Sequence, residues 1–319
     1  MDHSKALSVD EAKESLQSVM QNIEGVIRGK RDAIELVICC LAAGGHILLE
    51  DIPGTGKTML AKSLAKSIDG KCGRLQFTPD LLPADVLGST VFNPTTGVFS
   101  FQPGPVFTNV LIADEINRAS ARTQSALLEA MGEKQVSLDG KTYPLENPFL
   151  CIATQNPFDL QGTYQLPEAQ LDRFMLQLNL GYVSQSEELL LLKNGGATRD
   201  LLQQKPVVTI DLLRRLQRTV EGVRIEESIL RYVLEVANLT RAASQIRLGI
   251  SARGALHWVA MSKAHALMHA RDYVIPDDVL KMSKPVLAHR LILNTRAGDG
   301  SEAKIAVLTD LLKNATLPR

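Results

Sequence analysis

Short apolar runs alternate with helix-like segments along the first 193 residues of the chain. Five of these runs are typical of strands, and they cover 46–50, 73–77, 109–113, 149–154 and 174–178. A helix with one apolar face is predicted to begin after Ser120, whose side chain suits an N-cap. Alternation of this kind favours a mostly parallel sheet covered by helices. The pattern therefore predicts an α/β fold built on a parallel five-stranded sheet.

Two segments interrupt the simple alternation of strands and helices. The first, 91–101, has strand-like halves and turn residues from Asn93 to Gly97. The second, 135–143, turns at Asp139 and Gly140. Turn residues between two short strand-like runs are typical of hairpins. We expect both hairpins to project from the core.

Apolar periodicity is lost near residue 194, where Gly195 and Gly196 follow each other. Helical spacing dominates the remainder, and Pro276 followed by two aspartates predicts a helix start. We therefore predict an α/β domain over 1–193, a linker over 194–205 and a helical domain over 206–319.

Composition narrows the classes of protein further. The 35 basic and 35 acidic residues of the 319-residue chain cancel, which argues against strong binding to nucleic acid or to an anionic membrane. No apolar stretch reaches the length of about 18 residues that a membrane span needs, so no membrane insertion is expected. The four cysteines lie in apolar segments without Cys-x-x-Cys spacing, which argues against zinc and disulfides. Buried free thiols fit a cytoplasmic protein.

Residues 46–58 join an apolar strand to a loop that ends in Gly-Lys-Thr, and a helix is expected over 59–65. Backbone N–H groups of such a loop and the positive end of the helix converge on one anion. Lys57 would reach the β- and γ-phosphates, and Thr58 a bound Mg²⁺. Gly-Lys-Thr also occurs in ordinary surface loops. Asp51 stands where the full Walker A pattern has glycine, and we expect its side chain to lie outside the phosphate cradle.

Asp114 and Glu115 follow the apolar run at 109–113. An unpaired charge at the end of a buried strand costs several kcal/mol, on an order-of-magnitude view, so a compensating group is expected. Mg²⁺ held by Asp114 and Thr58 would compensate it, and Glu115 could polarise the attacking water. The alternative is a pair of solvated charges at a strand end.

Three further polar residues are candidates for the same site. Asn156 follows the apolar run at 149–154 and could orient the γ-phosphate and the water, although Asn-Pro alone is a turn signal. The guanidinium of Arg173 suits a transition state with dispersed phosphoryl charge, and an ion pair with Asp172 or Glu168 is the alternative. Arg253 begins a helix and could touch the γ-phosphate, but lone helical arginines are mostly solvated.

Together these motifs resemble the MoxR branch of the AAA+ ATPases over nearly the whole chain. The resemblance is carried by 44–50, the loop to Thr58, and the strings at 102–107, 113–119, 153–157 and 166–174. It implies a P-loop NTPase AAA+ core, an αβα sandwich, with a C-terminal all-α lid domain. It also implies that 91–101 is the family's insertion in helix 2 and 135–143 its hairpin before sensor 1.

The resemblance implies roles for individual residues. Lys57 and Thr58 belong to Walker A, Asp114 and Glu115 to Walker B, Asn156 to sensor 1 and Arg253 to sensor 2, while Arg173 is the arginine finger. The residues expected to contact ATP are Val26, Ile27, Gly54, Thr55, Gly56, Lys57, Thr58, Met59 and Asp114. Those expected to act in hydrolysis are Glu115, Asn156, Arg173 and Arg253. Thr58 and Asp114 would hold Mg²⁺. Lys30, where many relatives have glutamine, is expected to leave nucleotide choice intact.

The finger is expected to reach the nucleotide of a neighbouring subunit, which implies a ring, expected to be a hexamer. Relatives are associated with proteins that carry a von Willebrand factor A domain, so the leading hypothesis is an ATP-driven chaperone that remodels such a client. A DNA-acting AAA+ motor is an alternative, although balanced charge and 4% aromatic residues argue against it. A GTPase-type switch lacks its Asn-Lys-x-Asp string here, and no feature favours a magnesium-chelatase-like ATPase subunit.

Overall fold

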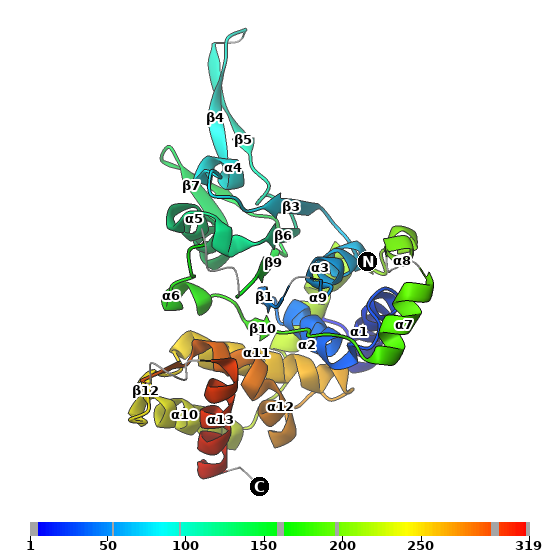
Figure 1. The fold of residues 1–319 in the computed structure, drawn as a ribbon, viewed down its shortest axis with the longest axis vertical. Coiled ribbons are helices and arrows are strands. Elements are labelled where there is room, and N and C mark those ends of the chain that lie inside the picture. Colours follow the sequence, from blue (N-terminus) through cyan, green and yellow to red (C-terminus); the bar gives the residue numbers. More distant parts are fainter. Residues whose placement is uncertain are drawn as a thin grey trace.

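The computed structural model describes residues 6–52, 54–95, 97–157, 163–194, 198–294 and 300–316. Pro53 of the loop, Thr96 of the first hairpin and 195–197 of the predicted linker lie outside these residues. An α/β half carries two hairpins at one end of the molecule, and a helical half lies at the other end (Figure 1).

The α/β half is built on one parallel sheet of five strands, as predicted. Its order is β10, β1, β9, β6, β3. The strands are β1 (Ile47–Glu50), β3 (Cys72–Gln76), β6 (Val110–Asp114), β9 (Leu150–Gln155) and β10 (Leu176–Leu178). β6 is buried along its whole length, which explains its continuous apolar run. Because the strands are parallel, their carboxyl ends meet at one edge, where ligands bind in open α/β sheets.

Helices cover both faces of this sheet and confirm the αβα sandwich. Ile47 and Leu49 face one apolar cluster, while Leu48 between them faces the other, as strand alternation requires. The first face packs against α1 (Val9–Glu24), α2 (Arg31–Ala42) and α3 (Lys57–Ser67), and the second against α4 (Pro83–Leu87) and α5 (Ala121–Glu133). Ser120 caps α5 by accepting from the backbone N–H of Thr123, as predicted.

Two hairpins project from the sandwich (Figure 1). β4 (Gly88–Asn93) pairs with β5 (Val98–Pro103), and β7 (Gln135–Leu138) pairs with β8 (Lys141–Pro144). Phe92 and Phe99 are exposed on the first hairpin with ring centroids 5.0 Å apart. At its foot the backbone leaves no room for a side chain, because a Cβ on Gly104 would lie 2.5 Å from the Gly88 nitrogen. Both hairpin predictions are confirmed.

The predicted linker range contains a helix. The chain passes from α6 (Glu168–Leu171) and β10 through α7 (Gln185–Asn194) to α8 (Thr198–Gln203), which lies inside 194–205. The double glycine that suggested a linker lies between these two helices in the sequence, outside the described residues. The following residues pack on the α/β half: β11 (Val208–Thr209) pairs with β2 (Ile68–Asp69), and Leu7 N–H donates to Thr219 Oγ1 (2.8 Å). The division of the chain at 193 and 206 stays a prediction.

The remainder is mostly helical, as expected, with one short strand pair. Its helices are α9 (Ile210–Glu221), α10 (Glu227–Ala242), α11 (Ala252–Met268), α12 (Pro276–Leu287) and α13 (Ser301–Asn314), with 3₁₀ turns η1 (Ile116–Arg118) in the α/β half and η2 (Ala288–Arg290) here. β12 (Ile246–Leu248) and β13 (Ile292–Leu293) pair antiparallel. α12 begins at Pro276, as predicted.

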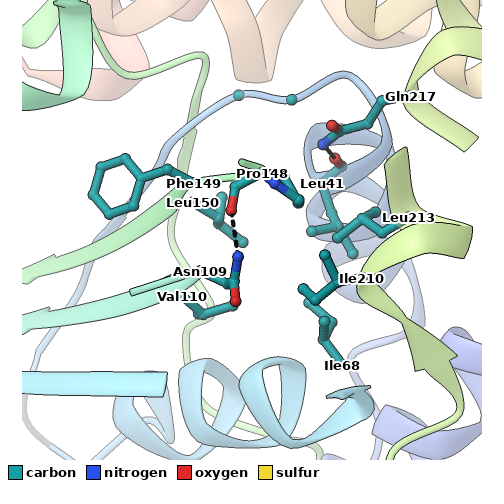
Figure 2. A pocket seen from close by; sticks show the side chains of 12 residues that line it. Leu41, Ile68, Asn109, Val110, Pro148, Phe149, Leu150, Ile210, Leu213 and Gln217 are labelled. Atoms are coloured by element: carbon teal, nitrogen blue, oxygen red, sulfur yellow. Dashed lines mark hydrogen bonds between the residues drawn. The ribbon is translucent and has the colours of Figure 1, made fainter. Parts of the chain in front are cut away.

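A small cavity of about 10 Å³ lies beneath α9, at the end of the sheet opposite the carboxyl edge. Figure 2 shows Leu41, Ile68 and Leu213 around it, with Asn109 donating to Pro148 O (3.0 Å). A cavity of this size holds about one water, so it is a packing feature rather than a ligand site.

Within the part of the chain that the structure describes, no helix combines the length and apolar character that a membrane span requires. Cys39, Cys40 and Cys151 are buried, and Cys72 is exposed. The expectation of buried thiols is therefore wrong for Cys72, because it begins the edge strand β3, whose residues alternate in exposure.

Candidate active site

The loop between β1 and α3 has the backbone of a phosphate cradle. Gly54 (φ 85°) and Gly56 (φ 93°) adopt left-handed conformations that other residues take at a cost. α3 begins at Lys57, so the N–H groups of its first turn face the loop. The Lys57 ammonium donates to the carbonyls of Asp51 and Ile52, and burial lowers its pKa. This arrangement keeps a cation inside the loop itself.

Asp51 is buried, and each oxygen of its carboxylate accepts a hydrogen bond from a backbone N–H. Oδ1 accepts from Ile52 N–H (2.8 Å) and Oδ2 from Gly181 N–H (2.5 Å). Gly181 follows β10, so the side chain ties the loop to the stretch after the edge strand. These contacts agree with the expectation that the carboxylate lies outside the cradle.

Asp114 ends β6 and is only 3% exposed, so the alternative of a solvated charge is wrong for this residue. Its Oδ1 accepts from Thr58 Oγ1 (3.2 Å) and Thr154 Oγ1 (3.3 Å). Its Oδ2 forms an ion pair with Arg74 Nε (2.8 Å) on β3. Sequence reasoning missed Arg74, although β3 was predicted. Thr58 and Asp114 place two hard oxygen donors side by side, and this donor set fits Mg²⁺.

Glu115 has the left-handed backbone conformation φ 56°, ψ 49°. For a residue other than glycine this is strained, and such strain clusters at functional sites. Its N–H donates to Thr154 Oγ1 (3.0 Å), and its carboxylate accepts from Gln76 (2.7 Å) and Arg118 (2.9 Å). The side chain is 38% exposed. The two neighbouring carboxylates therefore diverge: Asp114 turns toward Thr58, and Glu115 stays accessible to water.

Asn156 directly follows β9, the strand between β1 and β6. It is 9% exposed, and its backbone carbonyl accepts from Asn117 Nδ2 (3.2 Å). Strand order thus brings the residue after β9 to the same sheet edge as the loop after β1 and the carboxylates after β6.

Arg173 packs against the backbone of α5 at Gly132, where an added Cβ would lie 3.4 Å from its Nη1. The ion-pair alternatives for this residue are wrong, because Asp172 pairs with Arg290 (2.9 Å) and Glu168 with Arg247 (3.2 Å). Nη1 of Arg173 is buried and has no hydrogen-bond partner within the described ranges.

Arg253 is exposed in the first turn of α11. It precedes His257 by one turn of α11, and His257 accepts from Arg290, which also bonds to Asp172 of the α/β half. Among the described residues, the structure records no contact of Arg173 or Arg253 with the carboxylates after β6.

The segment expected at the adenine lies between α1 and α2. Val26 is buried, and a cleft of about 230 Å³ opens between Ile27, Gly29 and α7. Lys30 Nζ donates to the carbonyls of Leu180 (2.5 Å) and Tyr182 (2.7 Å), so it fastens this segment to the stretch after β10.

A larger cleft of about 710 Å³ separates the carboxyl edge of the sheet from α12 and α13. Glu50 and Gln155 line the sheet side, and Lys284 and Lys304 line the helical side. Asp51 and Ile52, at the start of the loop, also border this cleft, whereas Lys57, Thr58 and Asp114 are not among the residues that line it.

Comparison with known proteins places this geometry in a family. Residues 46–176 match the model of the ATPase family associated with various cellular activities (AAA), and 238–310 match the AAA lid domain. The chain is 44% identical over 304 residues to the uncharacterised protein YeaC of Bacillus subtilis, covering 95% of each chain. It is 37% identical to the chaperone MoxR1 of Mycobacterium tuberculosis, covering 96% of this chain and 83% of that one.

A crystal structure of a candidate ATPase from Cytophaga hutchinsonii superposes with a TM-score of 0.87. The two chains share 37% sequence identity over 98% of this chain and 97% of that one. Identity at this level along almost the whole length, together with both domain matches, shows that this protein belongs to the MoxR family of AAA ATPases.

Proposed function

We propose that this ATPase hydrolyses Mg·ATP within a hexameric ring in the cytoplasm and uses the reaction to remodel or mature a client protein. A client with a von Willebrand factor A domain is the leading candidate. The chaperone name of the Mycobacterium tuberculosis relative supports a protein client. Balanced charge gives no comparable support to a DNA-acting motor.

One observation carries the catalytic part of this proposal: Glu115, held in a strained conformation beside Asp114, presents an accessible carboxylate at the same edge as the loop. Glu115 would accept the proton of the attacking water, and Asn156 would orient that water. Lys57 would turn from its loop carbonyls to the phosphates. Thr58 and Asp114 would hold Mg²⁺, which when bound stabilises the charge on the phosphoryl oxygens.

Binding of the nucleotide would use the remaining loop residues and the first helical turn, with Gly54, Thr55, Gly56 and Met59 around the phosphates. Val26 and Ile27 would contact the adenine in the cleft beside α7. Arg253 would contact the γ-phosphate from the helical half. Closure of the 710 Å³ cleft would then couple the nucleotide to the position of that half.

The ring part of the proposal concerns Arg173. Its neighbours Asp172 and Glu168 already have other cationic partners, so its charge is not needed for an ion pair within its own chain. A guanidinium that lies against Gly132 rather than at its own loop can complete the site of an adjacent subunit.

Mixed rings test this arrangement. Arg173→Ala and Glu115→Gln should each lower ATP turnover by about 10³-fold or more, while ATP binding stays largely intact. A mixture of the two variants should regain up to about a quarter of wild-type turnover, because an Arg173→Ala chain then meets an intact finger from its Glu115→Gln neighbour.

Arg247→Ala is the control, because it removes a different arginine, one that is exposed and pairs with Glu168, and should leave turnover near the wild-type value. Differential tags on the two variants would verify that the rings are mixed. Verified mixed rings without any recovery would rule out the shared site.

The client is tested with Glu115→Gln, which should hold ATP without hydrolysing it. Proteins retained with ATP but released with ADP should include one with a von Willebrand factor A domain. Retention of nucleic acid instead, or stimulation of turnover by DNA at low salt, would support the motor hypothesis and contradict the chaperone.

A further inference from the structure

Two histidines and a carboxylate meet where α11 of the helical half crosses α2 of the α/β half. Glu35 lies on α2, His265 lies in the last turn of α11, and His269, four residues later, is the C-cap of that helix. One potential ligand atom from each of the three residues lies within 4.8 Å of the other two. These three residues are the helix-crossing cluster, and the proposed function uses none of them.

The hydrogen bonds of His265 direct one ring nitrogen into the cluster. Asp278 Oδ1 lies 2.5 Å from Nδ1, and because a carboxylate accepts, Nδ1 carries the proton. Asp278 is fully buried and is itself held by Arg271 (2.6 Å) and by Ile275 N–H (2.8 Å). The other ring nitrogen, Nε2, faces Glu35, and in the neutral imidazole it carries the lone pair.

His265 is only 6% exposed, and its Nε2 has no hydrogen-bond partner within the described ranges. The atom lies 3.2 Å from Glu35 Oε1. A buried ring nitrogen this close to a carboxylate oxygen needs a positive charge between the two atoms, and either a proton on Nε2 or a metal ion in its place supplies it. In a tetrahedral zinc site, bonds of about 2.0–2.1 Å place two ligand atoms about 3.3 Å apart, close to the separation seen here.

His269 is oriented in the same manner by a different partner. Its Nδ1 donates to the backbone carbonyl of His265 (3.0 Å), so its lone pair is also on Nε2. Metal-binding histidines characteristically donate their other nitrogen to a carboxylate or a backbone carbonyl, and this pair shows one of each. The His269 side chain is exposed, which gives an ion and a water ligand a path from solvent.

We infer that Glu35, His265 and His269 form a binding site for a divalent transition metal of the zinc class, with water as the fourth ligand. The site contains no cysteine, which is why cysteine spacing gave no indication of it. Its ligands come from α2 and α11, so the ion would join the α/β half to the helical half.

Lys281 is the competitor that this site must overcome. Its Nζ lies 2.6 Å from Glu35 Oε1, where it neutralises the carboxylate. The Lys281 side chain is 45% exposed and can turn into solvent when an ion binds. Removing this ammonium should therefore strengthen metal binding. If the three residues bind no metal, the same change only removes an ion pair of Glu35 and gives no gain in zinc affinity.

Titration of the full chain with Zn²⁺, in competition with a chromophoric chelator, tests the site. The exposed thiol is removed by Cys72→Ser in every sample, because it could bind zinc by itself. We expect one Zn²⁺ per chain. His269→Ala, which changes an exposed residue, should weaken binding by about 10–100-fold or more, and Glu35→Gln should do the same.

Lys281→Met should tighten binding several-fold, and Lys284→Met, one turn along α12, is its matched control and should leave the affinity unchanged. Circular dichroism establishes that each variant is folded. Zinc binding that is equally strong in His269→Ala and Glu35→Gln would overturn the inference. An affinity of Lys281→Met that does not exceed that of Lys284→Met would overturn it as well.

Discussion

Two arginines meet near Asp172, and the structure uses them in opposite ways. Arg290 of η2 is 5% exposed and donates to Asp172 Oδ1 (2.9 Å), to Phe174 O (2.6 Å) and to His257 Nδ1 (2.7 Å). Arg173, between Asp172 and Phe174 in the chain, has no ion pair in the ranges described. Arg290 thus joins the two halves of the molecule through an ion pair, whereas the guanidinium of Arg173 packs beside Gly132 without one in the same described ranges.

The largest expected difference between the two is in stability. Arg290→Met should lower the free energy of unfolding by about 3 kcal/mol or more, because Asp172 stays largely buried without its partner. Arg173→Met should cost less than about 1 kcal/mol, since it breaks no ion pair. Chemical denaturation of the two variants measures this. Equal losses would show that Arg173 also has a structural role.

The second largest effect expected is a loss of stability in acid, because His257 accepts a hydrogen bond from Arg290 only while it is neutral. Burial, and then the charge of Arg290, lower the pKa of His257 to about 3. This value lies below the unfolded pKa of about 6.5, so the folded state keeps His257 neutral. Its contribution is fully present above pH 6.5 and is lost as the pH falls toward 3, by about 1.4 kcal/mol at pH 5.5.

Denaturation at pH 7.5 and pH 5.5 checks this prediction, with His257→Gln as the comparison. The variant should lose less stability on acidification than the wild-type protein does. Identical losses would assign the acid sensitivity to other groups, of which buried His46, whose pKa burial lowers to about 4, is one.

The smallest expected difference is between two helix caps. Ser251 caps α11 by accepting from Gly254 N–H (2.9 Å) and also donates to Asp172 (2.9 Å). Ser251→Ala should cost about 1–2 kcal/mol. Ser120→Ala, which removes the cap of α5 without such a contact between the two halves, should cost about 1 kcal/mol. Thermal unfolding of both compares them. A smaller loss for Ser251→Ala would mean that Asp172 depends on Arg290 alone.

Much of the fold could be predicted because its signals are local. The apolar runs at 109–113 and 149–154 match β6 and β9 to within one residue, since both strands are buried on both faces. Parallel strand order then places Asp114 and Asn156 at one edge with the loop. The helix start at Pro276 and both hairpin turns could be predicted for the same reason, because each is determined by residues that are neighbours in the sequence.

The contacts that sequence reasoning missed join residues distant in the chain. Arg74 and Gln76 reach Asp114 and Glu115 only because β3 pairs with β6, a register that apolar runs do not reveal. Asp278 belongs to the helix-start signal after Pro276, and nothing in the sequence indicated that it is also buried and bonded to His265 and Arg271. Strand pairing determines the contacts of Arg74 and Gln76, and the packing of α11 against α12 determines that of Asp278 with His265.

The close packing at the foot of the β4–β5 hairpin determines how a movement of α4 would be passed to the tip of that hairpin. Gly88 and Gly104 touch backbone to backbone, so neither can shift without moving the other. Thr90 also bonds to Asp139 (2.7 Å), and Phe101 stacks on Tyr143 (4.0 Å), which links both hairpins. The first hairpin is therefore braced at its foot and along one side, so any rotation of α4, which leads directly into β4, would carry Phe92 and Phe99 at the far end with it.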